Sequence, residues 1–221
     1  MMDDTGLAQR GRQPVPQNFI RNAIFDFGGV LVRWQPQEII ARFYPDEFLR
    51  DLAKRMVFQH PDWVEMDRGT LSEGSAVQRF SARMERPLDE MVALLQHVKD
   101  SLTPIAESFA IVRGLERRGV SLYGLSNMSA TTFAYLREQY DLWKIFRGIV
   151  ISGEVNMVKP EAQIFEYISR MYKLVPCETV FIDDHLPNIE SANRLGFRTI
   201  LFSEPKQCVD ELDMIFSRKS H

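Results

Sequence analysis

Four groups of polar side chains in this chain follow short apolar runs, at points where strands are expected to end. These groups are Asp26 with Gly28 and Gly29, Ser126 with Asn127, Lys159, and Asp183 with Asp184. An aspartate can attack phosphorus and divide phosphoryl transfer into two steps, and a divalent cation offsets the repulsion between carboxylate and phosphate. A lysine and a hydroxyl–amide pair can neutralise and orient the remaining phosphoryl oxygens. The residue types therefore fit phosphoryl-transfer chemistry.

Each group alone has an ordinary structural interpretation. An aspartate at the end of a strand is commonly a turn residue or a helix N-cap, and a lysine before a proline is commonly solvated. Asp183 and Asp184 differ, because they directly follow the apolar run Val180–Ile182. Two carboxylates removed from water there would be costly without a nearby cation. The recurrence of all four groups at corresponding places favours one shared site.

The elements that must position these groups form an α/β pattern. Short apolar runs at 23–32, 120–125, 148–152, 179–182 and 198–202 alternate with helical patterns such as 106–118 and 161–175. This alternation predicts a Rossmann-like parallel sheet with helices on both faces. Ligands of such sheets bind at the carboxyl ends of the strands, where the four groups are expected to meet.

The long interval between the first two apolar runs contains helical patterns at 36–44, 46–58, 72–84 and 88–102. A crossover between parallel strands needs far fewer residues. We therefore predict an inserted all-helical cap at 35–103 and a core domain formed by 20–34 and 104–221. The polar, proline- and glutamine-rich residues 1–19 are predicted to be a flexible tail.

Composition narrows the classes of partner. The 221 residues carry 27 Lys and Arg against 30 Asp and Glu, a net charge of −3, which gives no reason to expect a nucleic acid or a membrane surface as partner. The two cysteines are too few for a disulfide framework, so we expect a cytoplasmic protein. Oligomeric state is not indicated by the sequence.

Taken together, the motifs resemble the haloacid dehalogenase-like superfamily over about 23–202. The resemblance is carried by FDFGGVL (25–31), LSN (125–127), VKPE (158–161) and FIDDHLPNI (181–189). The insert resembles the small helical cap of one subfamily. Within it, VKPEAQIF and DDHLPNIESANRLG are similar to bacterial sugar-phosphate phosphatases of the α-glucose-1-phosphatase type and to the N-terminal phosphatase domain of mammalian epoxide hydrolase.

The resemblance implies a role for each matching residue. Asp26 would be the nucleophile and a Mg²⁺ ligand, and Gly28 would offer its carbonyl to the metal. Asp184 would be the main acidic ligand, with Asp183 a second or water-bridged partner. Lys159 would stabilise the charge of Asp26 and of the phosphate.

Four further residues are interpreted by the same resemblance. Ser126 and Asn127 would bind the phosphate, and Asn188 stands where many relatives carry an acid, so it is expected to be an outer metal ligand only. We interpret His185 as a loop residue that points away, because imidazole is a poor first choice of ligand for Mg²⁺.

A cluster around Trp63, Glu65, Asp67 and Arg68 is interpreted as a solvated helix end and is not included in the site.

The sequence departs from the family at Gly28. Most phosphatases of the superfamily carry an aspartate there, which protonates the leaving oxygen and later activates water. We hypothesise that an anomeric sugar oxygen leaves with less protonation, which predicts a preference for a sugar phosphate such as glucose 1-phosphate over alkyl phosphates. Two alternatives stay open: a metal-independent 2-haloacid dehalogenase that uses Asp26, and a catalytically weak binding or regulatory protein.

Overall fold

The computed structural model describes residues 20–217, and the predicted tail at 1–19 lies outside them. Five parallel strands form one sheet in the order β3-β2-β1-β4-β5. Their bounds are β1 Asn22–Phe25, β2 Ser121–Ser126, β3 Gly148–Ile151, β4 Thr179–Asp183 and β5 Arg198–Leu201. The prediction of a Rossmann-like parallel sheet is confirmed.

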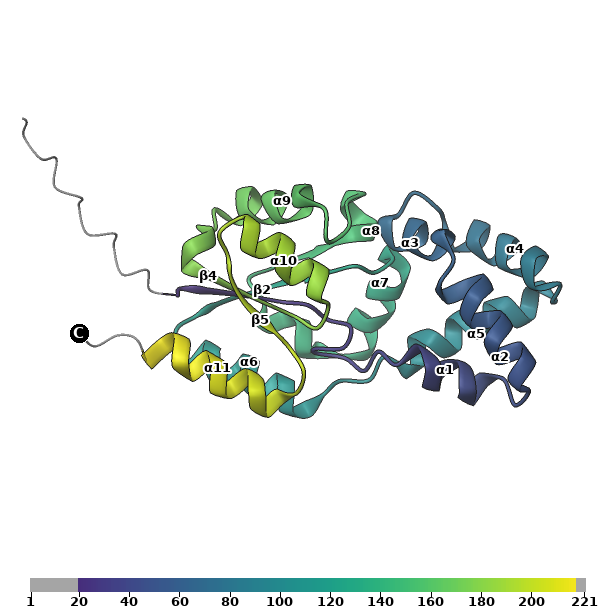
Figure 1. Cartoon of the computed structure of the whole chain (residues 1–221), viewed down its shortest axis with the longest axis horizontal. Coiled ribbons are helices and arrows are strands. Elements are labelled where there is room, and N and C mark those ends of the chain that lie inside the picture. The colour runs from purple at the N-terminus through teal and green to yellow at the C-terminus, as the bar shows by residue number, and fades with distance from the viewer. Residues whose placement is uncertain (1–19, 218–221) are drawn as a thin grey trace, which may run out of the picture.

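Helices cover both faces of the sheet, because successive strand side chains point to opposite sides. On one face, Phe25, Leu122 and Ile182 pack in a core with α6 (Ala106–Arg117), α7 (Ala130–Gln139) and α11 (Pro205–Ser217). On the other face, Ile24, Leu125 and Phe181 pack with α9 (Ala162–Tyr172) and α10 (Leu186–Arg194). Figure 1 shows α9 and α10 on one side of the strands and α6 and α11 on the other.

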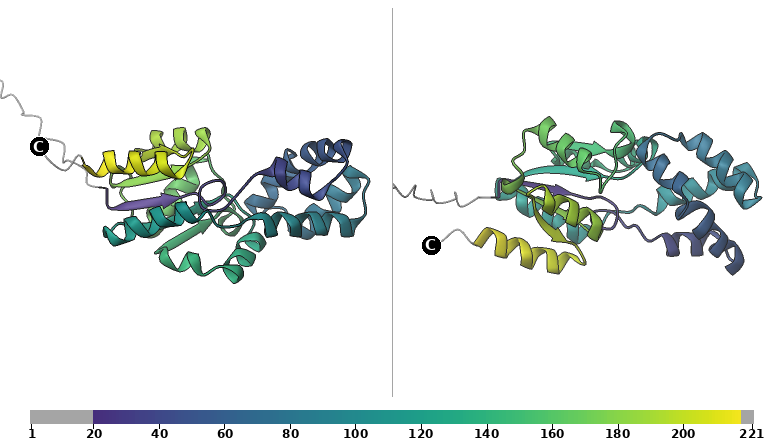
Figure 2. Two further views of the ribbon diagram at one scale, coloured as in Figure 1. Left: turned by 90° about the horizontal axis from the view of Figure 1, so that it is seen from below. Right: turned by 45° about the horizontal axis from the view of Figure 1, so that its top comes forward.

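The helices between β1 and β2 form a group beyond the end of the sheet, as both views in Figure 2 show. They are α1 Pro36–Phe43, α2 Glu47–Ala53, α3 Pro61–Arg68, α4 Glu73–Met84 and α5 Leu88–Ser101, with the π-helical turn η1 at Lys54–Phe58. A separate hydrophobic core around Phe80, Met91 and Leu94 holds this helical group together. That these helices act as a cap remains a proposal, taken up below.

Two adjacent segments join the helical group to the sheet. Val32 and Pro104 form an antiparallel bridge, and the amide of Arg33 donates to the carbonyl of Thr103 at 2.9 Å. The amide of Ile105 donates to the carbonyl of Leu31 at 2.8 Å. The chain therefore leaves the core and returns to it through one hydrogen-bonded pair of segments.

The remaining elements are short. They are η2 Asp141–Ile145, α8 Ser152–Val155 and η3 Pro176–Glu178. The continuous helix expected at 46–58 is wrong in detail, since an α-helix gives way to the π-helical turn at Lys54. The helix expected at 161–175 spans Ala162–Tyr172.

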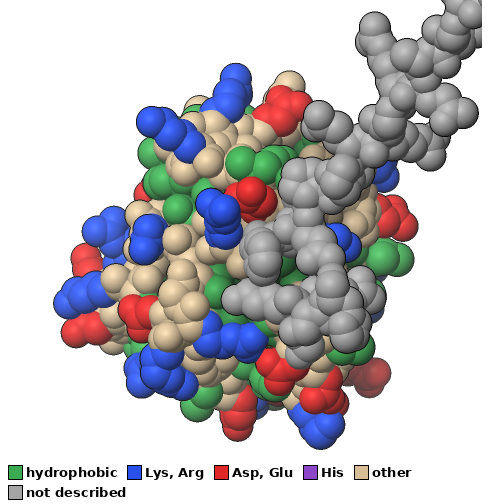
Figure 3. Space-filling view, turned by 90° about the vertical axis from the view of Figure 1, so that its left-hand side faces the viewer, with side chains coloured by type: hydrophobic (Ala, Val, Ile, Leu, Met, Phe, Trp, Pro, Cys, Tyr) green, Lys and Arg blue, Asp and Glu red, His purple; other side chains and the backbone are tan. Residues whose placement is uncertain are grey.

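Charge on the molecular surface is mixed. On the face in Figure 3, Lys and Arg side chains lie interspersed with Asp and Glu. Among the described residues, no helix combines the length and apolar character that a bilayer crossing requires.

Candidate active site

The carboxyl ends of the strands bring the four predicted groups to one cavity of about 550 Å³. Its lining includes Asp26 after β1, Ser126 and Asn127 at the end of β2, Lys159 and Asp184. β1 lies between β2 and β4, so the carboxylate after it is at the centre of the edge. Residues far apart in the sequence therefore meet where a parallel sheet binds its ligands.

Lys159 is the buried cation of this site. Its side chain is 1% exposed, and Nζ lies 2.8 Å from Oδ1 of Asp26 and 2.7 Å from Oδ2 of Asp183. Burial opposes the charge on Lys159, but Asp183 and Asp26 outweigh it and raise the pKa of Lys159. The ammonium is therefore held in its charged form between the two carboxylates.

Burial also acts on Asp26. It raises the pKa of Asp26 to about 7, with Lys159 lowering that pKa and Asp183 raising it further. A carboxylate with so little hydration and acidic neighbours favours the approach of a further cation.

Asp183 is fully buried and its oxygens are engaged by protein groups. Oδ1 accepts from the amide of His185 at 2.8 Å, and the amide nitrogen of Asn188 donates to both oxygens at 3.0 Å. With Lys159 bound to Oδ2, Asp183 chiefly holds other groups in place. Its expected part as a second or water-bridged partner of the metal stays a prediction.

Asp184 instead faces the cavity, and its carboxylate packs against Gly29. Burial, followed by the charge of Asp183, raises the pKa of Asp184. Oxygens of Asp26, Asp183 and Asp184 all lie within 4.8 Å of one another, so these side chains can hold a metal ion. Hard carboxylate oxygens are the donors that Mg²⁺ prefers.

Asn188 gives an independent indication of a missing group. It is 5% exposed and lines the cavity, and its side-chain oxygen is buried without a hydrogen-bond partner among the described residues. A buried acceptor without a partner is costly. A hydrated cation could satisfy it, so the donor set fits Mg²⁺. The outer metal position expected for Asn188 stays a prediction.

Ser126 and Asn127 differ in whether their side chains form hydrogen bonds within the protein. Within residues 20–217 the Ser126 hydroxyl makes no hydrogen bond, although the residue is 1% exposed and lines the cavity. The side chain of Asn127 donates to the carbonyl of Lys159 at 2.9 Å and accepts from its amide at 2.8 Å. Asn127 therefore fixes the backbone that carries the lysine, and its contact with phosphate remains a prediction.

Position 28, where most relatives carry an aspartate, lies beside an aromatic side chain of the cavity. A side chain added at Gly28 would begin 3.5 Å from Cβ of Trp34, in ordinary contact. Trp34 thus borders the space that an acid at this position would enter. Among the described residues, the other acids that line the cavity are Asp26, Asp67, Glu73 and Asp184.

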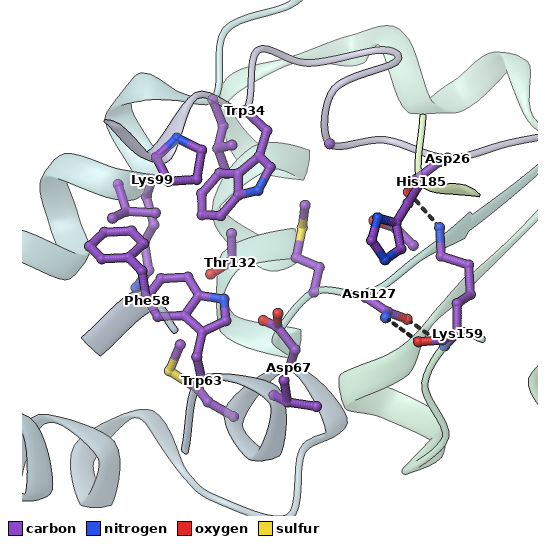
Figure 4. A pocket seen from close by; sticks show the side chains of 18 of the residues that line it. Asp26, Trp34, Phe58, Trp63, Asp67, Lys99, Asn127, Thr132, Lys159 and His185 are labelled. Carbon is purple, nitrogen blue, oxygen red and sulfur yellow. Dashed lines mark hydrogen bonds and ion pairs between the residues drawn. The ribbon is translucent and has the colours of Figure 1, made fainter. Parts of the chain in front are cut away.

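The helical group supplies the far wall of the cavity, and this wall is largely apolar. The rings of Phe58 and Trp63 stack with centroids 4.7 Å apart, and Trp34 stacks on Trp63 at 5.9 Å. Leu95, Val98 and Leu102 continue the wall. Figure 4 shows Trp34, Phe58 and Trp63 on the side of the cavity away from Lys159.

Two interpretations from the sequence are corrected here. His185 lines the cavity and does not point away from it. Asp67 and Trp63 also line the cavity, whereas they were interpreted as part of a solvated helix end. The signal available in the sequence was Gly69, because it ends α3 with a φ of +86°, and a Cβ there would overlap the carbonyl of Gly153. A glycine required by such a close approach indicates that the helix end docks on the core.

Comparisons with known proteins agree with this geometry. The chain is 30% identical to a sesquiterpene phosphatase of Aspergillus oryzae over 79% of its length and 85% of that protein. It is 25% identical to a D-ribitol-5-phosphate phosphatase of Bacteroides thetaiotaomicron, covering 81% of this chain and 90% of the other.

A solved structure shares the fold. It is a haloacid dehalogenase family enzyme of Bacteroides thetaiotaomicron in complex with magnesium and inorganic phosphate, with a TM-score of 0.69 and 20% identity over 83% of this chain and 94% of that one. The match to the family itself spans residues 20–196. The motifs at the strand ends, the sheet order and this match lead to one conclusion: the chain belongs to the haloacid dehalogenase-like hydrolases.

Proposed function

We propose that this hydrolase is a Mg²⁺-dependent phosphatase that works through an aspartyl-phosphate on Asp26. The observation that carries the proposal is the cluster of Asp26, Asp183 and Asp184 around the buried Lys159 at the strand ends. The phosphatases among its relatives support it.

Each residue has a part in the proposed reaction. Asp26 attacks phosphorus, the bond from phosphorus to the leaving oxygen breaks, and water later cleaves the aspartyl-phosphate. Lys159 keeps Asp26 ionised and neutralises a phosphoryl oxygen, while Ser126 binds another. Asp26, Asp184 and the carbonyl of Gly28 would hold Mg²⁺, which would supply charge that offsets the repulsion between the nucleophile and the phosphate.

For the organic part of the substrate, the cavity favours an apolar skeleton. The wall formed by Trp34, Phe58 and Trp63 presents stacked rings, and the aliphatic residues behind them offer no hydrogen-bonding groups. Glu73 and Lys99, which also line the cavity, are paired with each other at 2.7 Å. Burial of apolar surface provides the binding free energy for such a substrate. The sesquiterpene phosphatase relative supports a phosphorylated isoprenoid.

A sugar phosphate is the second candidate. It is favoured by the glycine at position 28, by the likeness to the glucose-1-phosphatase type and by the ribitol-phosphate phosphatase relative. In both cases the helices at 35–103 would act as a small cap that covers the phosphate edge and contacts the organic group.

The test is a hydrolysis assay of the full chain with a C15 isoprenoid monophosphate, glucose 1-phosphate, p-nitrophenyl phosphate and 2-chloropropionate. We expect phosphate release that EDTA abolishes, that Mg²⁺ restores and that Asp26→Asn lacks, with a higher kcat/KM for the isoprenoid than for the sugar. Chloride release indifferent to EDTA would establish the dehalogenase instead.

A second measurement separates the enzyme from a binding protein. Beryllium fluoride should form a stable adduct with the wild-type chain in the presence of Mg²⁺ and none with Asp26→Asn. Binding of phosphate esters without turnover of any of them would show that the protein is a binding protein and not an enzyme. The higher kcat/KM for glucose 1-phosphate would assign the sugar and reject the apolar substrate.

A further inference from the structure

The helical group places in the candidate active-site cavity one carboxyl that forms no ion pair within residues 20–217. Asp67, in the last turn of α3, lines the same cavity as Asp26, and Figure 4 shows its carboxyl pointing into that space between Trp63 and Asn127. No cation within residues 20–217 forms an ion pair with it, whereas Glu73, the other acid from the helical group in this lining, is bound by Lys99. Among the described residues, Asp67 therefore carries no counter-charge.

The backbone of Asp67 is connected to the loop after β2 through the side chain of Ser152. The hydroxyl of Ser152 donates to the carbonyl of Asp67 at 2.6 Å and accepts from the amide of Met128 at 2.8 Å. Met128 directly follows Asn127, so one buried hydroxyl joins α3 to the loop after β2.

The next residue fastens the same helix end on its other side. The guanidinium of Arg68 binds both carboxylate oxygens of Glu161 at 2.9 and 2.7 Å, two residues after Lys159. These contacts fix where the Asp67 carboxyl lies, as a catalytic group requires.

We propose that Asp67 is the catalytic general acid of this enzyme, which takes the place of the carboxyl missing at position 28. The proposal rests on the proposed phosphatase function. It also replaces the hypothesis that the leaving group itself compensates for Gly28.

The protonation state of Asp67 suits this part. Burial raises its pKa to about 8, while hydrogen bonds from the Ser129 backbone and the Trp63 indole lower it in part. Asp67 borders a cavity whose wall is largely apolar, which disfavours its anion. A general acid works best when its pKa lies near the working pH, so that its proton is present and can be given up.

The charged groups around Asp67 have partners elsewhere or lie across the cavity. On α3, Arg68 binds Glu161, and on α4, Arg79 and Arg83 bind Asp62. On α8, Glu154 is exposed. The other charged or titratable residues that line the cavity are Asp26, Asp184, Lys159, His185, Glu73 and Lys99. Burial therefore dominates the protonation of Asp67.

Asp67 donates a proton in the first half of the reaction and recovers one in the second. As Asp26 forms its bond to phosphorus, the bond from phosphorus to the leaving oxygen breaks, and the proton of Asp67 passes to that oxygen to give an alcohol. The Asp67 carboxylate then takes a proton from the water that attacks the aspartyl-phosphate. Inorganic phosphate leaves, and Asp26 and the protonated Asp67 are restored.

The test compares two leaving groups in wild type and Asp67→Asn. Nitrophenolate leaves without a proton, whereas the alkoxide from hexyl phosphate needs one. We expect kcat/KM for hexyl phosphate to fall by roughly 10²–10⁴-fold in Asp67→Asn, while kcat/KM for p-nitrophenyl phosphate is unchanged. In wild type, kcat/KM for hexyl phosphate should also decline as the pH rises through about 8, and Asp67→Asn should lack this decline.

Asp67→Glu, which keeps an acid, should retain the decline with pH, and Glu65→Gln is the matched control on the same helix. Equal loss on both substrates, or no loss on hexyl phosphate, would overturn the role of Asp67 while leaving the phosphatase intact. Absence of any turnover by wild type with Mg²⁺ would overturn both proposals.

Discussion

The ammonium of Lys159 lies 2.8 Å from Oδ1 of Asp26, and both side chains are shielded from solvent. The same ammonium binds Asp183, so removing it leaves two buried carboxylates without a counter-charge. Both the reactivity of Asp26 and the stability of the strand ends should therefore depend on this one cation.

For Lys159→Met we expect kcat to fall by roughly 10²–10³-fold, because an electrostatic partner of the nucleophile and phosphate is lost. The free energy of unfolding should fall by about 3–5 kcal/mol, as it does when one partner of a buried ion pair is removed. Phosphate release and urea unfolding measure the two effects. Lys144→Met removes an exposed lysine and is the control. Unchanged kcat would contradict the role of Lys159.

Gly29 and Gly28 offer a matched pair of substitutions next to the metal cluster. A Cβ at Gly29, where φ is +78°, would overlap the carboxylate of Asp184, whereas a Cβ at Gly28 meets only ordinary contact with Trp34. Gly29→Ala should therefore weaken Mg²⁺ binding and Gly28→Ala should leave it close to that of wild type. Calorimetric titration with Mg²⁺ checks this. Equal affinities in the two variants would place the metal elsewhere.

Asp26, Ser126 and Asp183 were predictable because each ends or follows an apolar run that forms a buried strand, whereas Lys159 comes eight residues after β3, beyond α8. Asp26 and Asp183 come directly after such runs, and parallel strands end at one edge. Position relative to a strand is a local property of the sequence, and so the acids of the site could be found without the fold.

The part on the helical group was not predictable in the same way. Trp63 and Asp67 face the cavity only because Gly69 and Arg68 dock α3 onto Gly153 and Glu161. These contacts join segments far apart in the sequence, so the local pattern of a polar helix end indicated solvent instead.

The ion pair between Arg68 and Glu161 fastens the helical group to the segment that carries Lys159. Both side chains are partly exposed, at 22% and 38%, so we expect a coupling free energy of about 0.5–1 kcal/mol. Arg68→Met and Glu161→Gln, alone and together, form a double-mutant cycle read in KM for the isoprenoid phosphate. Raising the salt concentration should reduce the coupling. Zero coupling at low salt would show that this pair does not hold the helix end.

The aromatic wall should decide the organic part of the substrate. Trp63→Ala removes the ring that stacks on both Phe58 and Trp34. We expect kcat/KM for the isoprenoid phosphate to fall by roughly 10–200-fold, as for lost apolar contacts of 1–3 kcal/mol, with little change for p-nitrophenyl phosphate. Val64→Ala, a smaller change in the same lining, is the comparison. A similar fall on both substrates would indicate a general disturbance of the cavity.

Asp67 should also make the free energy of unfolding depend on pH. Its pKa is about 8 in the folded chain against an ordinary value of 3.8, so between these values the folded state binds more protons than the unfolded state. Its contribution to the free energy of unfolding is therefore fully present below pH 3.8 and declines as the pH rises towards 8.

Asp67→Asn removes this dependence, because an amide does not titrate. At pH 8 the variant should melt above wild type, by roughly 2–4 °C for each kcal/mol of difference, and the advantage should shrink as the pH falls towards 4. The measurement is the difference in Tm between wild type and Asp67→Asn at each pH across this range. The titration of the other groups is common to both proteins and cancels in this difference. A difference that does not vary with pH would mean that Asp67 is as hydrated as an ordinary surface carboxylate. An enzyme that is more stable but slower on alkyl phosphates after this substitution would show that the buried acid is maintained for catalysis at a cost in stability.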